Sequence, residues 1–260
     1  MRIAAIQQDH NPGKVEENRA KAVAYAKQAV AGHADIILFH EELLIGYHKD
    51  MKKLAETLHG ETTQAFQQVL KGTDAKIIYG LTEREGDKYY ISAPVVTESG
   101  VIANYRKTHL YWKAQGTLRD EAAQFTAGDA LTVFEHKGHK IGILLCYDGD
   151  FPEMFRTYAR LGCSVVLWLN NRTSRGHRDC CTQAAHHNSL IVATTCNCGL
   201  DESGIICEGL SNIVNYDGKL LGELSMSEGI VWADVDPAQA LETRKSMPTY
   251  VGLRPELYTI

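Results

Sequence analysis

The sequence predicts an α/β fold, and three observations carry this prediction. Short apolar runs rich in β-branched residues recur along the chain, and several are too uniformly apolar to have a face in water. Segments with apolar residues at helical spacing lie between some of these runs. A turn-like Arg-Glu-Gly-Asp-Lys segment joins two of the runs, which predicts an antiparallel hairpin within a mixed sheet.

The predicted elements alternate along the chain. The predicted strands, in order, are RIAAIQ, DIILF, KIIYGLTE, YYISAPVVT, KIGILLCY, SVVLWLN, LIVATT, SNIVNY and IVWADV. Helices are predicted over residues 15–31, 61–71, 152–162 and 177–188. The third begins at Pro152, whose fixed φ and missing N–H suit the first turn of a helix.

Length, charge and cysteine use limit the class of protein. The chain has 260 residues and no linker-like or repeated segment, so we expect one domain over residues 1–260. Its net charge of −5 and scattered basic residues argue against nucleic acid as a partner. No apolar segment is long enough for a signal peptide or a membrane span, and an odd count of seven cysteines favours free thiols. We therefore expect a cytoplasmic protein that does not bind membranes.

Reactive side chains lie after buried strands at three places in the chain. Glu41 and Glu42 follow the second strand, Lys107 follows the YYISAPVVT region, and Cys146 ends the KIGILL run. Because loops gather at the strand ends of an α/β sheet, residues far apart in sequence meet there. A thiol attacks as its thiolate, so it needs a base or a positive neighbour, and a helix that starts at Pro152 adds a favourable dipole. The set predicts a cysteine nucleophile assisted by a glutamate and a lysine.

Three ordered motifs resemble those of the nitrilase superfamily of carbon–nitrogen hydrolases. FHEELLIGY is similar to the family's first motif and places its catalytic glutamate on Glu41 and not on Glu42. YRKTHL places the family's lysine on Lys107, and CYDGDFPE places its nucleophile on Cys146. EAAQFTAG resembles the segment that carries a further glutamate, which would be Glu121 and would orient the lysine and the substrate. The resemblance covers nearly the whole chain.

The resemblance implies a fold, a reaction and an assembly. The family fold is a four-layer α-β-β-α sandwich with two mixed β-sheets, and it commonly dimerises. The implied enzyme is a thiol-dependent amidohydrolase without a cofactor, in which Glu41 takes the Cys146 proton and a thioester forms. Lys107 and the backbone N–H of Tyr147 would hold the oxyanion. The aromatic tail over residues 247–260 is expected to pack against something, such as a second subunit.

The resemblance also has departures, and it leaves the substrate open. His40 replaces the usual proline, and His187 stands where the family generally has glutamate. Tyr147-Asp148 after the nucleophile resembles amidase and carbamoylase branches, so a small linear amide or N-carbamoyl compound is favoured over a nitrile. Asp150 suggests a cationic substrate, whereas Arg172 and Arg175 suggest a carboxylate, and the alternative is that these charges pair with each other or lie in solvent. The candidate substrate-binding residues are Tyr47, Tyr147, Asp150, Asn170, Asn171 and Arg172.

Other functions compete with this interpretation. The cysteines and histidines between residues 180 and 207 suggest zinc, but their spacing is not the paired C-x-x-C of zinc sites, so no metal site is expected. His109 and His177 are alternative partners for a catalytic cysteine. Nitrile hydrolysis, acyl transfer to an acceptor other than water, and a catalytically silent binding protein on this fold also stay open.

Overall fold

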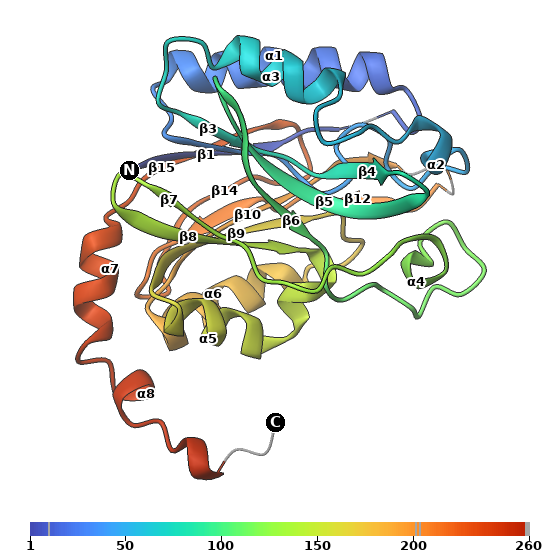
Figure 1. Ribbon diagram of the computed structural model, residues 1–260. Helices are drawn as coiled ribbons and strands as arrows, with labels where there is room; N and C mark the ends of the chain where they lie inside the picture. The colour runs from blue at the N-terminus through green and yellow to red at the C-terminus, as the bar shows by residue number, and fades with distance from the viewer. Residues whose placement is uncertain (10, 201, 203, 258–260) are drawn as a thin grey trace.

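Two β-sheets lie face to face between two layers of helices in the computed structural model (Figure 1). Helices α1 (Val15–Ala31) and α3 (Glu61–Val69) cover the first sheet, and α5 (Pro152–Arg160) and α6 (Gly176–Asn188) cover the second. The four-layer sandwich that the sequence motifs implied is therefore confirmed. The structure describes residues 1–9, 11–200, 202 and 204–257.

The first sheet is mixed. Its strand order is β15 (Gly229–Asp234), β1 (Arg2–Gln7), β2 (Ile36–Leu38), β3 (Lys76–Ile78), β5 (Lys88–Thr97) and β4 (Leu81–Glu85), and β6 (Gly100–Arg106) also pairs with β5. Strands β1, β2 and β3 are parallel, whereas the others are antiparallel to their neighbours. Strands β4 and β5 form the hairpin predicted from the Arg-Glu-Gly-Asp-Lys turn.

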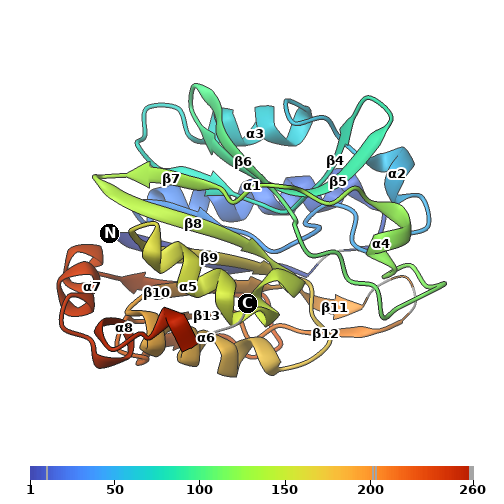
Figure 2. The ribbon, with the colours of Figure 1, turned by 60° about the horizontal axis from the view of Figure 1, so that its bottom comes forward.

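The second sheet has a parallel centre and antiparallel edges. Its strand order is β14 (Leu220–Glu223), β13 (Asn212–Val214), β10 (Ile191–Cys196), β9 (Cys163–Asn170), β8 (His139–Leu145) and β7 (Val133–His136). Strands β8, β9 and β10 are the parallel ones. Figure 2 shows α5 and α6 against this sheet and the separate pair β11 (Cys198–Leu200) and β12 (Ile206–Glu208) beyond the end of β10.

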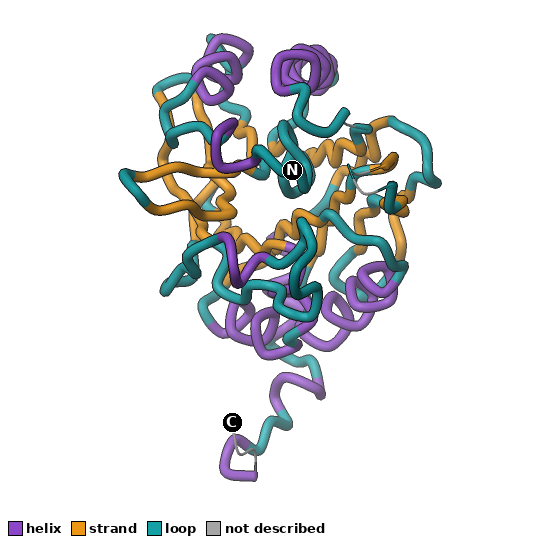
Figure 3. Tube along the Cα trace, turned by 90° about the vertical axis from the view of Figure 1, so that its right-hand side faces the viewer, coloured by secondary structure: helices purple, strands orange, loops and turns teal. Residues whose placement is uncertain are grey.

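Strand β9 shows why the second sheet is apolar on both faces. Val165, Leu167 and Leu169 pack into the core between the two sheets, whereas Val166 and Trp168 pack into the core beneath α5 and α6. All residues of the strand are buried. A strand covered on both sides has no reason to alternate polar and apolar residues, which explains the continuous apolar run SVVLWL. Figure 3 shows the same layering from the end of the sandwich, with strands enclosed between helices.

The predicted strand KIIYGLTE is divided in two by Tyr79 and Gly80, which lie between β3 and β4. A Cβ atom on Gly80 would lie 2.4 Å from the Cα of Glu41, so only glycine allows the two segments to approach this closely. The amide of Gly80 also donates to the carbonyl of His40 at 3.0 Å. The backbone at Gly80 thus helps to position the segment that carries Glu41.

The remaining helices are short and lie in connections or near the C-terminus. They are α2 (Met51–Leu54), α4 (Glu121–Gln124), α7 (Pro237–Arg244) and α8 (Pro248–Val251), with single turns at Cys146–Asp150 and Pro255–Leu257. The described part of the tail extends from α7 beyond α5 and α6, and Val251 and Leu257 are exposed (Figure 1). The packing expected for these two side chains is therefore not made within the described chain.

Candidate active site

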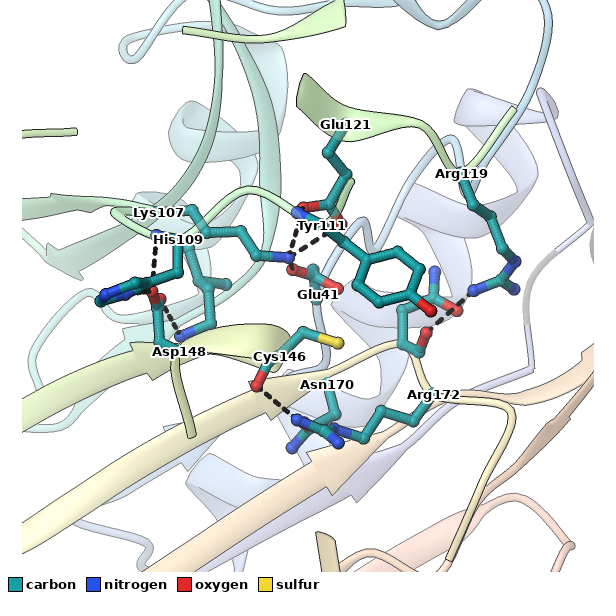
Figure 4. Close-up of polar contacts among 12 residues, drawn as sticks. Glu41, Lys107, His109, Tyr111, Arg119, Glu121, Cys146, Asp148, Asn170 and Arg172 are labelled. Carbon is teal, nitrogen blue, oxygen red and sulfur yellow. Dashed lines mark hydrogen bonds and ion pairs between the residues drawn. The ribbon is translucent and has the colours of Figure 1, made fainter. Parts of the chain in front are cut away.

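The reactive residues predicted from the sequence meet where strands of both sheets end (Figure 4). Glu41 follows β2 and Lys107 follows β6, both in the first sheet, and Cys146 follows β8 in the second sheet. Glu121 is the first residue of α4. The fold thus brings together four side chains that are distant in sequence.

Lys107 is the centre of a buried charge cluster. Its Nζ lies 2.8 Å from a carboxylate oxygen of Glu41 and 2.8 Å from Glu121, and its side chain is fully buried. Burial lowers the pKa of Lys107, but the carboxylates of Glu121 and Glu41 outweigh it and raise the pKa well above its ordinary value. Lys107 therefore stays charged, and its third N–H is available for a ligand.

Glu121 is fixed by donors other than Lys107. The hydroxyl of Tyr47 donates to it at 2.5 Å, and the backbone N–H of Tyr111 donates at 2.8 Å. Because these bonds hold its carboxylate in one orientation, Glu121 in turn fixes the position of the Lys107 ammonium group.

Glu41 has the properties of a base. Burial raises its pKa above the ordinary value of 4.5, and this effect outweighs the attraction of Lys107. Its Oε2 atom has no hydrogen-bond partner among the described residues. Cys146 and Glu41 lie together in the site (Figure 4), and each affects the pKa of the other. A carboxylate with a raised pKa and a free oxygen is well suited to accept a proton.

Cys146 begins a single 3-10 turn directly after β8, with a left-handed φ of 40°. This backbone conformation is strained for a residue other than glycine and is often found at functional sites. Burial, together with the negative charge of Glu41, raises the pKa of the Cys146 thiol to about 12. The thiol is therefore protonated at neutral pH and requires a base before it can attack.

Asp148 fixes the nucleophile turn against the loop that follows β6. Its Oδ1 accepts bonds from the backbone of His109 at 2.9 Å and from Thr108 at 3.0 Å. Its Oδ2 accepts bonds from Tyr105 at 2.9 Å and from the backbone of Leu145 at 3.1 Å. A carboxylate with all its oxygens engaged is a structural residue, and here it connects the segments that carry Lys107 and Cys146.

A small cavity of about 180 Å³ lies beside Cys146. This is below the roughly 300–1,000 Å³ of pockets that hold drug-sized ligands, which suits a small substrate. Five of the six residues expected to bind substrate line it, and Asn170 does not. Its full lining is Tyr47, Tyr111, Arg119, Glu121, Cys146, Tyr147, Asp150, Asn171, Arg172, Thr173 and Ser174.

Asn170 does not line the cavity but orients the side chain of Arg172. It is fully buried, its amide donates to the Trp168 carbonyl and the Thr194 hydroxyl, and its Oδ1 accepts from Arg172 Nε at 2.8 Å. Every polar atom of this side chain is therefore engaged within the protein. The sequence placed Asn170 at the correct strand end but did not show where its side chain points.

Asp150 and Arg172 form an ion pair of 2.8 Å at the cavity wall. In the sequence, Asp150 suggested a cationic substrate and Arg172 suggested an anionic one. Because the charges neutralise one another, neither provides a free charge for a ligand. Arg175 pairs with Glu208 at 2.8 Å, and its side chain is 73% exposed. It is not among the cavity-lining residues.

Sequence reasoning missed Tyr111 and Arg119, which line the cavity from the loop between Lys107 and Glu121. The guanidinium of Arg119 lies over the Tyr47 ring at 4.5 Å from its centroid and donates to the carbonyl of Asn171 at 3.1 Å. The one available signal was position, since this loop connects two residues of the predicted site.

The histidines have other partners. His177 bonds to the carbonyls of Ser174 and Gly209, and His109 bonds to Asp148 and stacks on Phe151. Burial lowers the pKa of His40 to about 4, so this histidine is neutral at physiological pH. His187 is exposed on α6. In the described part of the chain, no cluster of three or more metal-ligating side chains exists, and all seven cysteines are free thiols.

Glu42, like its neighbour Glu41, is a buried carboxylate whose pKa is raised by burial, and its titration leads to a prediction about stability. Burial raises the pKa of Glu42 to about 8 from an ordinary value of 4.5. The folded protein therefore holds this proton at pH values where the unfolded chain has lost it, so stability falls as pH rises between these two values. We expect Glu42→Gln, which cannot ionise, to gain stability relative to the wild type by up to about 1.4 kcal/mol per pH unit in that range.

Urea unfolding of both proteins at several pH values measures this difference. A constant difference between Glu42→Gln and the wild type would show that Glu42 is ionised in the folded protein. His40, on the other side of Glu41, is neutral in the folded protein over this range but takes up a proton in the unfolded chain below about pH 6.5, so it adds a slope of opposite sign. This slope is common to both proteins and cancels in the difference between them.

A four-layer sandwich in which a thiol, two carboxylates and an ammonium group share one small buried site is the arrangement of a cysteine-dependent hydrolase. The model of the carbon-nitrogen hydrolase family matches residues 2–245, and this chain belongs to that family. The family predicted from the sequence motifs is therefore confirmed.

Relatives and solved structures agree with this assignment. An (R)-stereoselective amidase of a Pseudomonas species is 31% identical over 247 residues, which span 92% of this chain and 87% of the relative. The human omega-amidase NIT2 is 28% identical over 100% of this chain and 97% of its own. A mutant of the amidase from Nesterenkonia sp. AN1 has a TM-score of 0.81 at 25% identity, covering 97% of this chain and 100% of that one. In that structure, acrylamide has added to the active-site cysteine by Michael addition.

Proposed function

We propose that this protein is an amidase that cleaves the C–N bond of small linear amides or N-carbamoyl compounds through a thioester on Cys146. The observation that carries this proposal is the buried set of Glu41, Lys107 and Cys146 beside a cavity of about 180 Å³. The amidase names of the similar proteins support it.

In the proposed first half-reaction, Glu41 takes the thiol proton of Cys146 while the sulfur attacks the carbonyl carbon. The resulting oxyanion accepts bonds from the free N–H of Lys107 and from the backbone N–H of Tyr147. The C–N bond then breaks, ammonia leaves with the proton from Glu41, and the acyl group stays on sulfur as a thioester.

In the second half-reaction, water takes the place of the leaving group. Glu41 removes a proton from this water, which attacks the thioester carbon. The same two donors stabilise the second oxyanion, and its collapse returns the proton to the Cys146 sulfur and releases the acid. Glu121 keeps Lys107 in place throughout.

A neutral acyl group suits the cavity best, because Asp150 and Arg172 already neutralise each other. A charged group would enter without a free partner, and burying an unpaired charge is costly. We therefore expect neutral primary amides to be hydrolysed faster than the corresponding cationic and anionic amides, by at least about 10²-fold in kcat/KM. A nitrile needs attack on a linear carbon and protonation of nitrogen, so matched nitriles should be slower still.

An ammonia-release panel tests this prediction with amide, ureido and nitrile forms of neutral, cationic and anionic acyl groups. Faster turnover of nitriles would overturn the amide assignment. A strong preference for anionic substrates would instead assign a carboxylate-binding role to an arginine of the cavity.

A second prediction concerns the acyl carrier. During turnover of a slow amide or carbamoyl substrate, intact-protein mass spectrometry should show one acyl adduct, and peptide mapping should locate it on Cys146. Cys181 and Cys196 are fully buried and have raised thiol pKa values, so they are matched thiols that should stay unmodified. An adduct on either of these two cysteines would contradict the proposed mechanism.

We further propose that the enzyme is cytoplasmic and forms a homodimer. Seven free thiols favour a reducing compartment. The exposed Val251 and Leu257 of the tail give a second copy an apolar contact. No helix among the described residues is long and apolar enough to cross a membrane.

A further inference from the structure

The guanidinium of Arg172 is held on several sides although it lines the cavity. Its Nε donates to Asn170 at 2.8 Å, and its Nη2 lies 2.8 Å from Asp150. Its plane lies over the ring of Trp168, 4.9 Å from the centroid, and its side chain is only 10% exposed. A guanidinium with this many partners is positioned by the protein before any substrate arrives.

The remaining partner of Arg172 is the nucleophile itself. Its Nη2 donates to the backbone carbonyl of Cys146 at 2.7 Å, and the indole N–H of Trp168 donates to the same oxygen at 2.9 Å. Cys146 has the strained left-handed φ of 40°. Two strong donors on one carbonyl help to hold a backbone conformation that a cysteine would otherwise avoid.

The position of this carbonyl fixes a second group. A trans peptide unit is planar, so the carbonyl of Cys146 and the N–H of Tyr147 point in opposite directions. Holding the oxygen toward Arg172 therefore directs the N–H away from Arg172. A positive group bound to the carbonyl also polarises the peptide and makes its N–H a stronger donor.

We propose that Arg172 is a positioning residue that orients and polarises the Cys146–Tyr147 peptide, so that the N–H of Tyr147 stabilises the oxyanion. This inference rests on the proposed function, because the oxyanion is that of amide hydrolysis. It gives Arg172 a role other than binding a substrate carboxylate. Asp150 and Asn170 act one step further away, by orienting the guanidinium.

The main test compares Arg172→Met with Arg175→Met. Both remove an arginine from the same connection after β9, but Arg175 is exposed and lies outside the cavity lining. For a neutral primary amide, we expect Arg172→Met to lower kcat by about 10- to 10²-fold and to change KM by less than about threefold. Arg175→Met should match the wild type.

Two further measurements separate positioning from general structural damage. Adding guanidinium ion to Arg172→Ala should restore kcat by at least about tenfold, because the added ion fills the site of the missing group. Asp150→Asn should lower kcat less than Arg172→Met does, and it should cause no further loss in the Arg172→Met background, since both act through one guanidinium. Thermal unfolding of each variant reports on its fold.

The outcomes are distinguishable. A wild-type protein that releases no ammonia from any amide would overturn both the proposed function and this inference. An active wild type with an unchanged Arg172→Met would overturn the positioning role alone. So would an increase in KM confined to anionic amides, which would make Arg172 a substrate-binding residue. If Arg172→Met does not fold, Asp150→Asn and guanidinium rescue of Arg172→Ala decide the question.

Discussion

Replacing Glu41 by glutamine is expected to lower kcat by at least about 10³-fold while the protein stays folded. The thiol of Cys146 is protonated at neutral pH, because burial raises its pKa to about 12. Glutamine has the shape of glutamate but accepts no proton, so neither half-reaction has a base. Its amide oxygen still accepts a bond from Lys107, which keeps the buried cluster assembled. Ammonia release and thermal unfolding measure the two properties.

Glu42→Gln is the matched control for this experiment. The side chain is as buried as that of Glu41, but it accepts a bond from Thr82, whereas Glu41 accepts one from Lys107. Its turnover should stay within about threefold of the wild type. An inactive Glu42→Gln together with an active Glu41→Gln would show that the first motif is aligned one residue out of register.

Substitution of Lys107 by methionine is expected to lower kcat by about 10²- to 10³-fold, the usual loss for one oxyanion donor. Methionine fills a similar volume but removes the charge between Glu41 and Glu121. The two carboxylates then face each other without a cation, so the pKa of at least one rises further. Stability should fall by about 3–5 kcal/mol, as it does when one partner of a buried pair is removed.

Lys113→Met provides the comparison, because Lys113 is an exposed lysine on the loop between Lys107 and Glu121. Both its activity and its urea midpoint should match those of the wild type. Full turnover by Lys107→Met would mean that the oxyanion is held elsewhere, and it would remove Lys107 from the proposed mechanism.

The sequence predicted those features that depend on local pattern. Helix 15–31 has the bounds predicted for it, since acidic and apolar residues of the segment follow a helical period. Cys146 lies at the end of its strand because the apolar run stops there and an acidic turn follows. The motif order also identified Glu41, Lys107 and Glu121, which the fold brings into contact.

Features that depend on the direction in which a side chain points could not be predicted from the sequence. Spacing placed Asn170 and Arg172 near the site, but only tertiary packing decides that Asn170 points inward and binds Arg172. Pairing was one of the alternatives open for Asp150 and the arginines, but these residues lie on different loops, so no local pattern could select it or choose Arg172 over Arg175. No local pattern predicted the role of Gly80 either. Because Gly80 has no side chain, the backbone at Glu41 can pack directly against it.

The site residues come from two different sheets, so catalytic turnover reports whether the two sheets are packed against each other. Glu41 and Lys107 extend from the first sheet and Cys146 extends from the second. The amide of Glu41 donates to the carbonyl of Asn170 at 3.3 Å, which is one of the links across the interior. A loosened state that kept both sheets but separated their inner faces would retain its far-ultraviolet signal and lose its catalytic power. Hydrolysis should therefore disappear at the lowest denaturant concentration that opens the space between the sheets, before the helices unwind.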